Sequence, residues 1–271
     1  SSFIRADLGL VPIQSGRADY AGAPLAGPVE RREIEQRRDL QLILQDPVGA
    51  LNPQMRVQSL VGEALSVHEP ALSSKARLAR VVETLEQVGL GDEYLGRYPH
   101  ELSGGQAQRV AIARALVLGP KVLICDEAVA ALDGSVREQV LALLRKVQED
   151  TNLSIIFISH DLAVVRAISH RVLVMYMGRL VELADNASLF SRPRHPYTRA
   201  LIDAVPVPDP VVARRKAPLR GEVPSLLEPP PGCVFHPRCE YAVEICTIEL
   251  PKTREVKGTR VACHRVDEID L

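Results

Sequence analysis

Leu102-Ser103-Gly104-Gly105-Gln106 opens a helical pattern that runs to Arg114, and Val122-Leu123-Ile124-Cys125-Asp126-Glu127 follows about one helix length later. The first stretch places a serine and two glycines at a helix N-terminus, where free N–H groups and the helix dipole favour a phosphate. The second is an apolar strand ending in two carboxylates, one suited to hold Mg²⁺ and one to orient a water. Taken alone, the first stretch could be an ordinary serine N-cap, and the second could be an acidic pair at an exposed strand end. The two together indicate a phosphate and Mg²⁺ site far more specifically than either does alone.

Two further strand candidates end in polar side chains that could contact the same ligand. Gln45 stands where one apolar run stops, and His160 stands where another does. Ligands of open α/β sheets gather at the carboxyl ends of the strands, so we expect these two side chains to converge with Asp126 and Glu127 on one crevice. The amide of Gln45 could ligate Mg²⁺ or place a water.

The chain up to residue 204 alternates helical patterns with short apolar runs, which is typical of an α/β domain with a largely parallel sheet. Strands buried on both faces are predicted at 40–44, 122–125, 154–158 and 172–176. The apolar stripe from Val136 to Val147 predicts a crossover helix between the second and third of them. Residues 46–118 contain no convincing strand and are predicted to be a helical insertion.

The amino-acid composition changes after residue 204. Residues 205–231 hold 8 of the 20 prolines, so this stretch is predicted to be an extended connector rather than helix or central strand. A cysteine-rich tail, 232–271, follows it.

Composition narrows the class of protein. The 271 residues carry 33 Lys and Arg against 34 Asp and Glu, a net charge of −1, which gives no electrostatic reason to expect nucleic acid as the main partner. No run approaches the roughly 20 apolar residues that cross a bilayer, and the first residues do not look like a signal peptide. We therefore expect a cytoplasmic protein whose membrane role, if it has one, comes through a partner.

These motifs, in this order, resemble the ATP-binding subunits of ABC transporters. The matching elements are the signature motif at Leu102–Gln106, the Walker B strand at Val122–Glu127, the Q-loop at Gln45, the D-loop at Ala131-Leu132-Asp133 and the switch histidine at His160. The resemblance covers nearly everything up to residue 204. It implies a P-loop NTPase core with a parallel sheet, a helical signature subdomain, and a head-to-tail dimer that holds two ATP molecules between its protomers.

The resemblance also implies a role for each residue. Glu127 would be the general base, Asp126 would hold Mg²⁺ through water, and Gln45 would sense Mg²⁺ and the membrane partner. His160 would contact the γ-phosphate. The opposite protomer would bind the same nucleotide through Ser103, Gly104, Gly105 and Gln106, with Asp133 at the dimer seam.

The chain departs from the family pattern at two places. Ala130 stands where the family usually has Ser before the D-loop, which could weaken a hydrogen bond across the dimer. More seriously, the sequence lacks a Gly-x4-Gly-Lys-Ser/Thr loop. Its opening, Ser1–Leu10, resembles the helix after that loop, so Ser1 would supply the Mg²⁺-binding hydroxyl and Ser2 a nucleotide contact, unless the two serines are only a ragged terminus. We expect a fragment that binds ATP poorly and is inactive alone.

Four of the five cysteines, Cys233, Cys239, Cys246 and Cys263, lie in the tail. Without an export signal, clustered thiols indicate metal binding sooner than disulfides. Their spacing does not match paired Cys-x2-Cys knuckles. On chemistry alone they suit a [4Fe–4S] cluster or a structural Zn²⁺ equally well, and unliganded buried thiols are the remaining alternative.

The tail narrows the resemblance to one branch of the family. The run His195–Leu201, the stretch Gly221–Ser225 and the cysteines resemble the C-terminal extension of oligopeptide and dipeptide importers, a branch that also includes nickel transporters. Gln45-Asp46-Pro47 with Leu51-Asn52-Pro53 fits that branch too. The resemblance implies an iron–sulfur cluster rather than Zn²⁺, with a structural role.

The leading hypothesis is therefore an ATPase subunit that energises import of short peptides from the cytoplasmic face of the membrane. Its implied partners are a second ATPase subunit, identical or paralogous, two membrane-spanning permease subunits and an extracytoplasmic substrate-binding protein. One alternative is a soluble ABC protein acting on DNA or ribosomes, against which the neutral charge stands. Another is a non-catalytic regulatory module, which would have no chemical need for Glu127 and His160. The transported molecule cannot be read from these residues.

Overall fold

The computed structural model describes residues 2–25, 27–29, 32–46, 49–205 and 221–271, without the side chains of Ser2, Phe3 and Asp7. The chain forms two compact units, Ser1–His160 and Asp161–Leu271. Each is described by itself.

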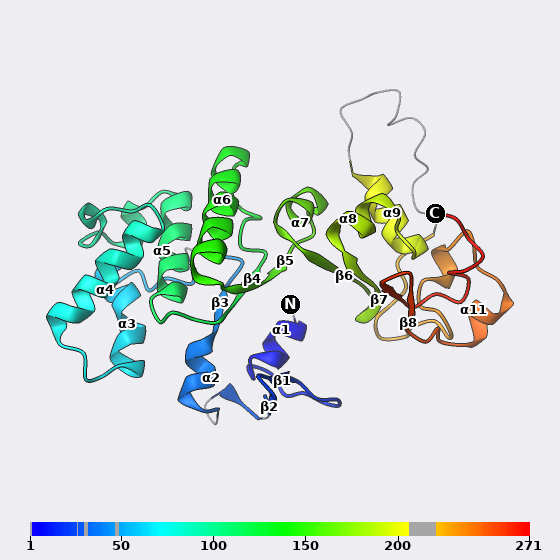
Figure 1. Cartoon of the computed structure of the whole chain (residues 1–271), viewed down its shortest axis with the longest axis horizontal. Helices are drawn as coiled ribbons and strands as arrows, with labels where there is room; N and C mark the ends of the chain where they lie inside the picture. The colour runs from blue at the N-terminus through cyan, green and yellow to red at the C-terminus, as the bar shows by residue number, and fades with distance from the viewer. Residues whose placement is uncertain (1, 26, 30–31, 47–48, 206–220) are drawn as a thin grey trace. The chain divides into compact units, whose positions relative to one another are not determined.

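The first unit contains the predicted parallel sheet. Strands β3 (Leu40–Ile43), β4 (Val122–Asp126) and β5 (Ser154–Ile158) pair in that order, all parallel (Figure 1). Helix α1 (Ser2–Asp7) packs Ile4 against Ile124 of the central strand. Because parallel strands end at one edge, the residues that follow the three strands are brought together there.

Helices lie on both sides of this sheet, and three others form a group of their own (Figure 1). The predicted crossover helix is present as α6 (Gly134–Thr151), which links β4 to β5 and lies on the other side of the sheet from α1 (Figure 1). Helices α3 (Val57–His68), α4 (Ser74–Gln87) and α5 (Gly104–Leu116) pack on one another. Two short 3-10 turns, η2 (Asp92–Tyr94) and η3 (Pro99–Glu101), precede α5.

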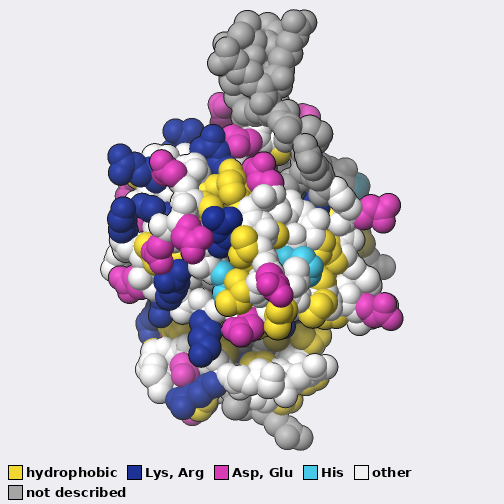
Figure 2. Space-filling view, turned by 90° about the vertical axis from the view of Figure 1, so that its right-hand side faces the viewer, with side chains coloured by type: hydrophobic (Ala, Val, Ile, Leu, Met, Phe, Trp, Pro, Cys, Tyr) yellow, Lys and Arg dark blue, Asp and Glu magenta, His cyan; other side chains and the backbone are white. Residues whose placement is uncertain are grey.

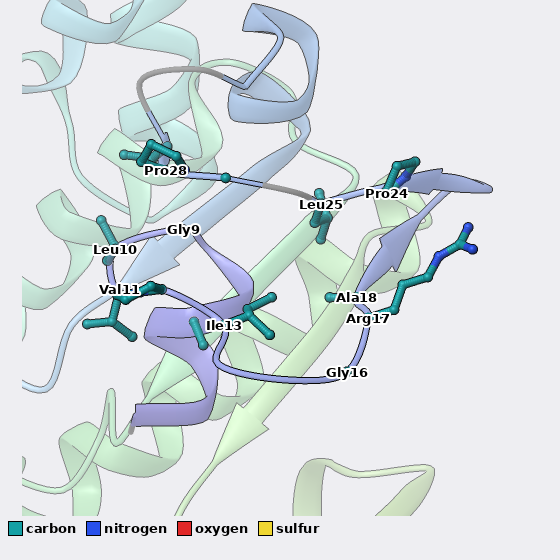
Figure 3. Close-up of a pocket in the computed structure, with 14 residues that line it drawn as sticks. Gly9, Leu10, Val11, Ile13, Gly16, Arg17, Ala18, Pro24, Leu25 and Pro28 are labelled. Atoms are coloured by element: carbon teal, nitrogen blue, oxygen red, sulfur yellow. The ribbon is translucent and has the colours of Figure 1, made fainter.

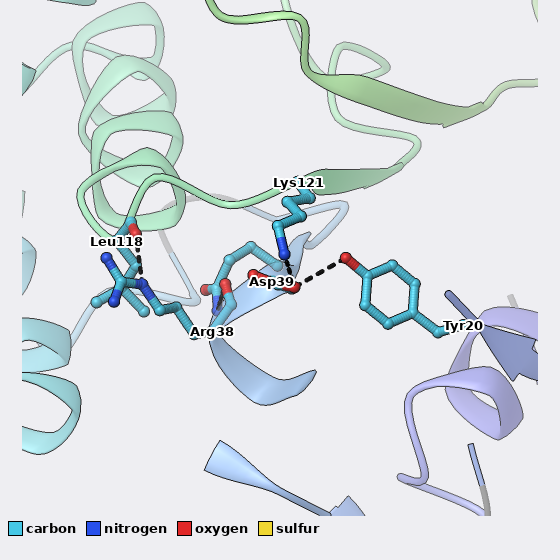
Figure 4. Close-up of polar contacts among 6 residues, drawn as sticks. Tyr20, Arg38, Asp39, Leu118 and Lys121 are labelled. Atoms are coloured by element: carbon cyan, nitrogen blue, oxygen red, sulfur yellow. Dashed lines mark hydrogen bonds and ion pairs between the residues drawn. The ribbon is translucent and has the colours of Figure 1, made fainter. Parts of the chain in front are cut away.

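A small hairpin, β1 (Asp19–Tyr20) and β2 (Ala23–Pro24), is tied to the amino end of the sheet. Its anchor is Asp39, the last residue of α2 (Ile34–Asp39). Asp39 Oδ2 accepts a hydrogen bond from the Tyr20 hydroxyl at 2.9 Å and lies 2.8 Å from Lys121 Nζ (Figure 4). This contact joins the hairpin to the strands through charged and hydrogen-bonded groups.

The second unit holds an antiparallel sheet in the order β6-β7-β9-β8. Its strands are β6 (Arg171–Tyr176), β7 (Arg179–Asp185), β8 (Arg254–Val256) and β9 (Thr259–Val261). The prediction that 172–176 is a strand buried on both faces was wrong. The turn at Met177-Gly178, where both residues have positive φ, folds β7 back antiparallel on β6, so alternate residues such as Leu173 are exposed (52%). In β5, too, Ile156 is 47% exposed.

Short helices complete the second unit: α7 (Leu162–Ile168), α8 (Asn186–Ser191), α9 (Pro196–Ala204), η4 (His236–Arg238) and α11 (Glu244–Ile248). The aromatic rings of Tyr176, Tyr197 and Phe235 contact one another in its core. Apolar side chains are also exposed on one face of this unit, with histidine and acidic groups near them (Figure 2). Ile245 and Ile248 of α11 are among the exposed apolar residues.

Of the predicted connector, 205–231, residues 206–220 lie outside the described part of the chain, and 221–231 form turns and irregular backbone. Among the helices that the structure describes, none is both long and apolar enough to cross a membrane.

Candidate functional site

Glu127 is the centre of a three-residue cluster at the carboxyl edge of the parallel sheet. It follows β4 directly, has a positive φ of 52°, and donates its N–H to the carbonyl of Ile158 at 3.0 Å. Gln45 Nε2, just beyond β3, donates to Glu127 Oε2 at 2.7 Å. His160 Nδ1, just beyond β5, lies 3.3 Å from Glu127 Oε1. Three strand ends thus bring Gln45, Glu127 and His160 together.

The cluster has the geometry of a proton acceptor open to solvent. The side chain of His160 is 74% exposed and that of Glu127 is 28% exposed. For the imidazole to donate to the carboxylate, Nδ1 must carry the proton. A carboxylate held by an amide on one oxygen and an imidazole on the other is fixed in direction and can accept a proton from a bound water. Asp126, the last residue of β4, lies beside it in the sequence.

The serine and glycines of the predicted phosphate loop begin α5. The Ser103 hydroxyl accepts from the Gln106 N–H at 3.3 Å, and Gln106 Oε1 accepts from the Ser103 N–H at 2.9 Å, a reciprocal capping box. A Cβ at Gly105 would lie 2.7 Å from Val136 Cγ1, so glycine permits the helix start to approach α6. These hydrogen bonds stay within the loop and do not involve Glu127.

Of the remaining predicted nucleotide contacts, the structure describes the side chain of Asp133 but not those of the two serines at the start of the chain. Asp133 is exposed and stands at the N-cap of α6, where its side chain accepts no hydrogen bond from the N–H groups of the helix. Ser1, the side chain of Ser2 and Pro47 lie outside the described residues.

A pocket of the first unit lies away from these residues. It has a volume of about 660 Å³ and is lined mainly by apolar residues between Ala6 and Val29, with Arg17 turned away from it (Figure 3). Among the described residues, none of the predicted catalytic, nucleotide-binding or metal-binding residues lines it.

The four cysteines of the tail line one small cavity of the second unit together with His195, His236 and His264. All four are free thiols. Burial raises the pKa of Cys239 to about 11, an effect that a hydrogen bond from the backbone N–H of Tyr241 opposes. Within the described residues, no group of three or more His, Cys, Asp or Glu side chains is arranged to hold a single metal ion.

Sequence reasoning missed a buried polar contact beside this cavity. Glu182 on β7 is 0% exposed, and its two oxygens accept the backbone N–H groups of Arg194 and His195 at 2.8 and 3.0 Å. Burial raises the pKa of Glu182, and these two hydrogen bonds work in the opposite direction. The one available signal was a lone acidic residue within the apolar run Leu180–Ala184.

Comparison with known proteins identifies the family. Residues 1–130 match the ABC transporter family, and residues 181–246 match "Oligopeptide/dipeptide transporter, C-terminal region". The oligopeptide transport ATP-binding protein OppF of Salmonella typhimurium is 46% identical over 271 residues, which cover 99% of this chain and 81% of OppF. This chain belongs to the ATP-binding proteins of ABC transporters.

Two further likenesses agree with this assignment. The probable peptide ABC transporter ATP-binding protein y4tS of Sinorhizobium fredii is 48% identical to this ATP-binding protein over 265 residues, covering 97% of the chain and 75% of y4tS. A solved dimeric ATP-binding cassette, bound to ADP and phosphate in a post-hydrolysis state, matches with a TM-score of 0.60 and 25% identity over 68% of this chain and 79% of that one. The expected ABC ATPase core is therefore confirmed.

Proposed function

We propose that this ATP-binding protein is the ATP-hydrolysing subunit of an importer for short peptides. Its relatives are named as peptide-transport ATP-binding proteins, and its C-terminal region matches that of oligopeptide and dipeptide transporters. The observation that carries the hydrolytic part is the contact of Gln45 and His160 with the two oxygens of Glu127.

Glu127 acts as the general base. Its carboxylate accepts a proton from a water whose oxygen attacks the γ-phosphorus of ATP, and ADP leaves with the electrons of the broken P–O bond. Gln45 orients this water and Glu127, and His160 contacts the γ-phosphate oxygens. The contacts of Gln45 and His160 with Glu127 support these roles because they bring the three side chains together at the carboxyl edge of the sheet.

The residues present also fit Mg²⁺. Asp126 ends β4, Gln45 lies just beyond the neighbouring strand β3, and together they offer the carboxylate and amide oxygens that this ion prefers. Since the amide nitrogen of Gln45 contacts Glu127, its oxygen is the atom to ligate the ion. When bound, Mg²⁺ would neutralise charge on the phosphates. We assign a third ligand to the Ser1 hydroxyl, and a nucleotide contact to Ser2, by resemblance to the family.

The loop Ser103–Gln106 caps the γ-phosphate of a nucleotide held by the opposite protomer. The N-terminus of the 13-residue helix α5 supplies N–H groups and a partial positive charge for this contact. Asp133 lies at the seam of the same dimer. The dimeric cassette structure, which matches 68% of this chain, supports this arrangement.

The importer would place this chain on the cytoplasmic face of the membrane. Its partners would be a second ATPase subunit, two permease subunits and an extracytoplasmic binding protein that delivers the peptide. The permeases would supply the membrane spans.

The four cysteines of the second unit fit a metal–sulfur centre. They line one cavity, and three of them receive a hydrogen bond from the backbone N–H two residues ahead: Cys233 from Phe235, Cys239 from Tyr241 and Cys263 from Arg265. Such donors stabilise the thiolate that a metal needs.

A [4Fe–4S] cluster is favoured over Zn²⁺. A cluster takes one thiolate at each of four iron corners, so its ligands lie farther apart than those of a single ion. All four thiols line the same cavity, and the cysteine-rich tail resembles that of the importer branch, which implies the cluster. When bound, the cluster would cross-link Cys233, Cys239, Cys246 and Cys263, and its role would be structural.

Isolation of the protein from its own cells, through a tag and in mild detergent, tests the proposed function. We expect permease subunits to co-purify and peptide with its binding protein to stimulate ATP hydrolysis in reconstituted vesicles. Hydrolysis should be lost in Glu127→Gln. Co-purification of nucleic acid or ribosomes in place of membrane subunits would contradict the proposal.

A further inference from the structure

His195 is a buried histidine with both ring nitrogens engaged. It is 1% exposed and stands at the N-cap of α9, where Nδ1 accepts the Tyr197 N–H at 3.0 Å. The other ring nitrogen donates to the backbone carbonyl of Ala262. This pattern fixes the Nε2–H tautomer and leaves neither nitrogen to ligate a metal.

The ring of His195 contacts both segments that carry the cysteines. Ala262 directly precedes Cys263. On another side, the ring lies 5.8 Å, centroid to centroid, from that of Phe235, whose N–H is hydrogen-bonded to the sulfur of Cys233. His195 also lines the cavity that the four cysteines share.

The backbone of His195 is held just as firmly. Glu182 Oε2 accepts its N–H at 3.0 Å. Glu182 is paired with Val261 across β7 and β9, and the Ala262 N–H donates to the Val181 carbonyl at 2.9 Å. The strand that leads to Cys263 and the turn that leads to α9 are therefore fixed to the same segment of β7.

We propose that His195 is a positioning residue for the four-cysteine site, holding the Cys263 segment at a set distance from the Cys233 segment so that their sulfurs face one cavity. This inference rests on the proposed metal centre. Burial lowers the pKa of His195 to about 4, so the ring is neutral near pH 7 and Nδ1 remains an acceptor.

Two substitutions distinguish the hydrogen bond of the ring to the Tyr197 N–H from its hydrogen bond to the Ala262 carbonyl. In His195→Asn, the short amide can still cap α9, as Asn does at many helix N-termini, but cannot reach Ala262. In His195→Gln, the amide nitrogen stands where Nε2 stood and can still donate to the Ala262 carbonyl. His170→Asn, at an exposed histidine of the same unit, is the control.

The chain and its variants are reconstituted anaerobically with ferrous iron and sulfide, or with Zn²⁺ alone, and metal per chain is measured with the rate of metal loss in air. We expect full loading for the unaltered chain, the control and His195→Gln, and at least a threefold faster loss from His195→Asn. Equal loading and loss in Asn and Gln variants would overturn the role of His195 and leave the metal site standing. No uptake by the unaltered chain would overturn both.

A measurement on the unaltered chain covers the case in which the variants do not fold. Nitrogen-15 NMR should show the Nε2–H tautomer of His195, with that proton exchanging at least tenfold more slowly once metal is bound. An Nδ1–H tautomer, or no change in exchange on metal binding, would overturn the proposal.

Discussion

At the scale of single residues, the backbone at Glu127 matters as much as its carboxylate. A positive φ is uncommon for a residue with a side chain, and Glu127 adopts one directly after the end of β4. Because of this turn, the side chains of Glu127 and Asp126 point in different directions, so the two adjacent acids can take different roles. It also brings the carboxylate within reach of Gln45 and His160.

Replacing Glu127 by Gln should remove hydrolysis and spare nucleotide binding. The amide keeps the shape of the side chain but cannot accept the proton, so we expect a loss of about 10² to 10⁴ in turnover. Phosphate release and nucleotide affinity of the isolated transporter complex measure the two effects. Glu138→Gln, at an exposed position on α6, should change neither. Hydrolysis within tenfold of normal in Glu127→Gln would exclude the general-base role.

A second residue-scale prediction concerns Gly232. Its φ is +68°, and a Cβ there would lie 2.5 Å from the carbonyl oxygen of Cys246. Gly258 also has a positive φ, +78°, but has open space around it. Gly258→Ala should cost about 1 kcal/mol of left-handed strain. Gly232→Ala should cost roughly 1 to 3 kcal/mol more, because backbone must move, and should lower metal loading. Urea unfolding and metal content measure both, and equal effects at the two glycines would contradict the close approach.

At the scale of elements, the hairpin β1–β2 depends on Asp39. Burial alone would raise the pKa of Asp39, but hydrogen bonds from Lys121 and Tyr20 outweigh it and hold the pKa below its usual value. A lowered pKa in the folded state gives stability that is present above the unfolded value, about 3.9, and is lost as the pH falls through the folded one.

Asp39→Asn should therefore destabilise the first unit by about 1 to 2 kcal/mol at pH 7 and flatten its loss of stability below pH 4. Asp19→Asn is a matched control, since Asp19 forms an exposed ion pair with Arg17 that contributes little. Urea unfolding between pH 3 and 7 gives both quantities. An unchanged pH profile in Asp39→Asn would show that the anchor does not hold the hairpin.

A comparison of two serine N-caps distinguishes an effect on helix stability from the loss of a phosphate contact. Ser103 caps α5 and Ser73 caps α4 in the same way, each accepting an N–H from three residues ahead. Replacement by Ala should cost each helix about 1 kcal/mol. Only Ser103→Ala should lower ATP turnover in the transporter complex beyond tenfold. If Ser73→Ala lowers turnover equally, the effect is one of stability and Ser103 has no special role.

The elements also show what sequence patterns can predict. Three parallel strands were predicted to within one residue, because each is a short apolar run bounded by polar residues. The run Val172–Tyr176 was placed correctly but assigned to the wrong kind of sheet, since a continuous apolar run hides which residues are exposed. Strand β7 has Glu182 in its centre, and β8 and β9 are three residues long, so none carried a clear pattern.

At the scale of the whole molecule, the two groups of chemical residues were predictable to different degrees. Gln45, Glu127 and His160 were grouped correctly because parallel strands end at one edge. The four cysteines could be grouped only by composition. The contact between Glu182 and His195 could not be foreseen, because it joins a strand to the N-cap of a helix 13 residues further along the chain and no periodic pattern marks it.

The two units bury separate apolar clusters, so one unit can lose stability without the other. The proposed metal would cross-link only segments of the second unit, so removing it with an iron chelator under oxidising conditions should loosen that unit alone. Amide exchange should rise at least tenfold in 232–248 and 259–266, because the cavity there loses its cross-links. Exchange in β3, β4 and β5 should stay the same, since their core contains none of the four cysteines. A matching rise in β3 to β5 would mean that the two units unfold as one.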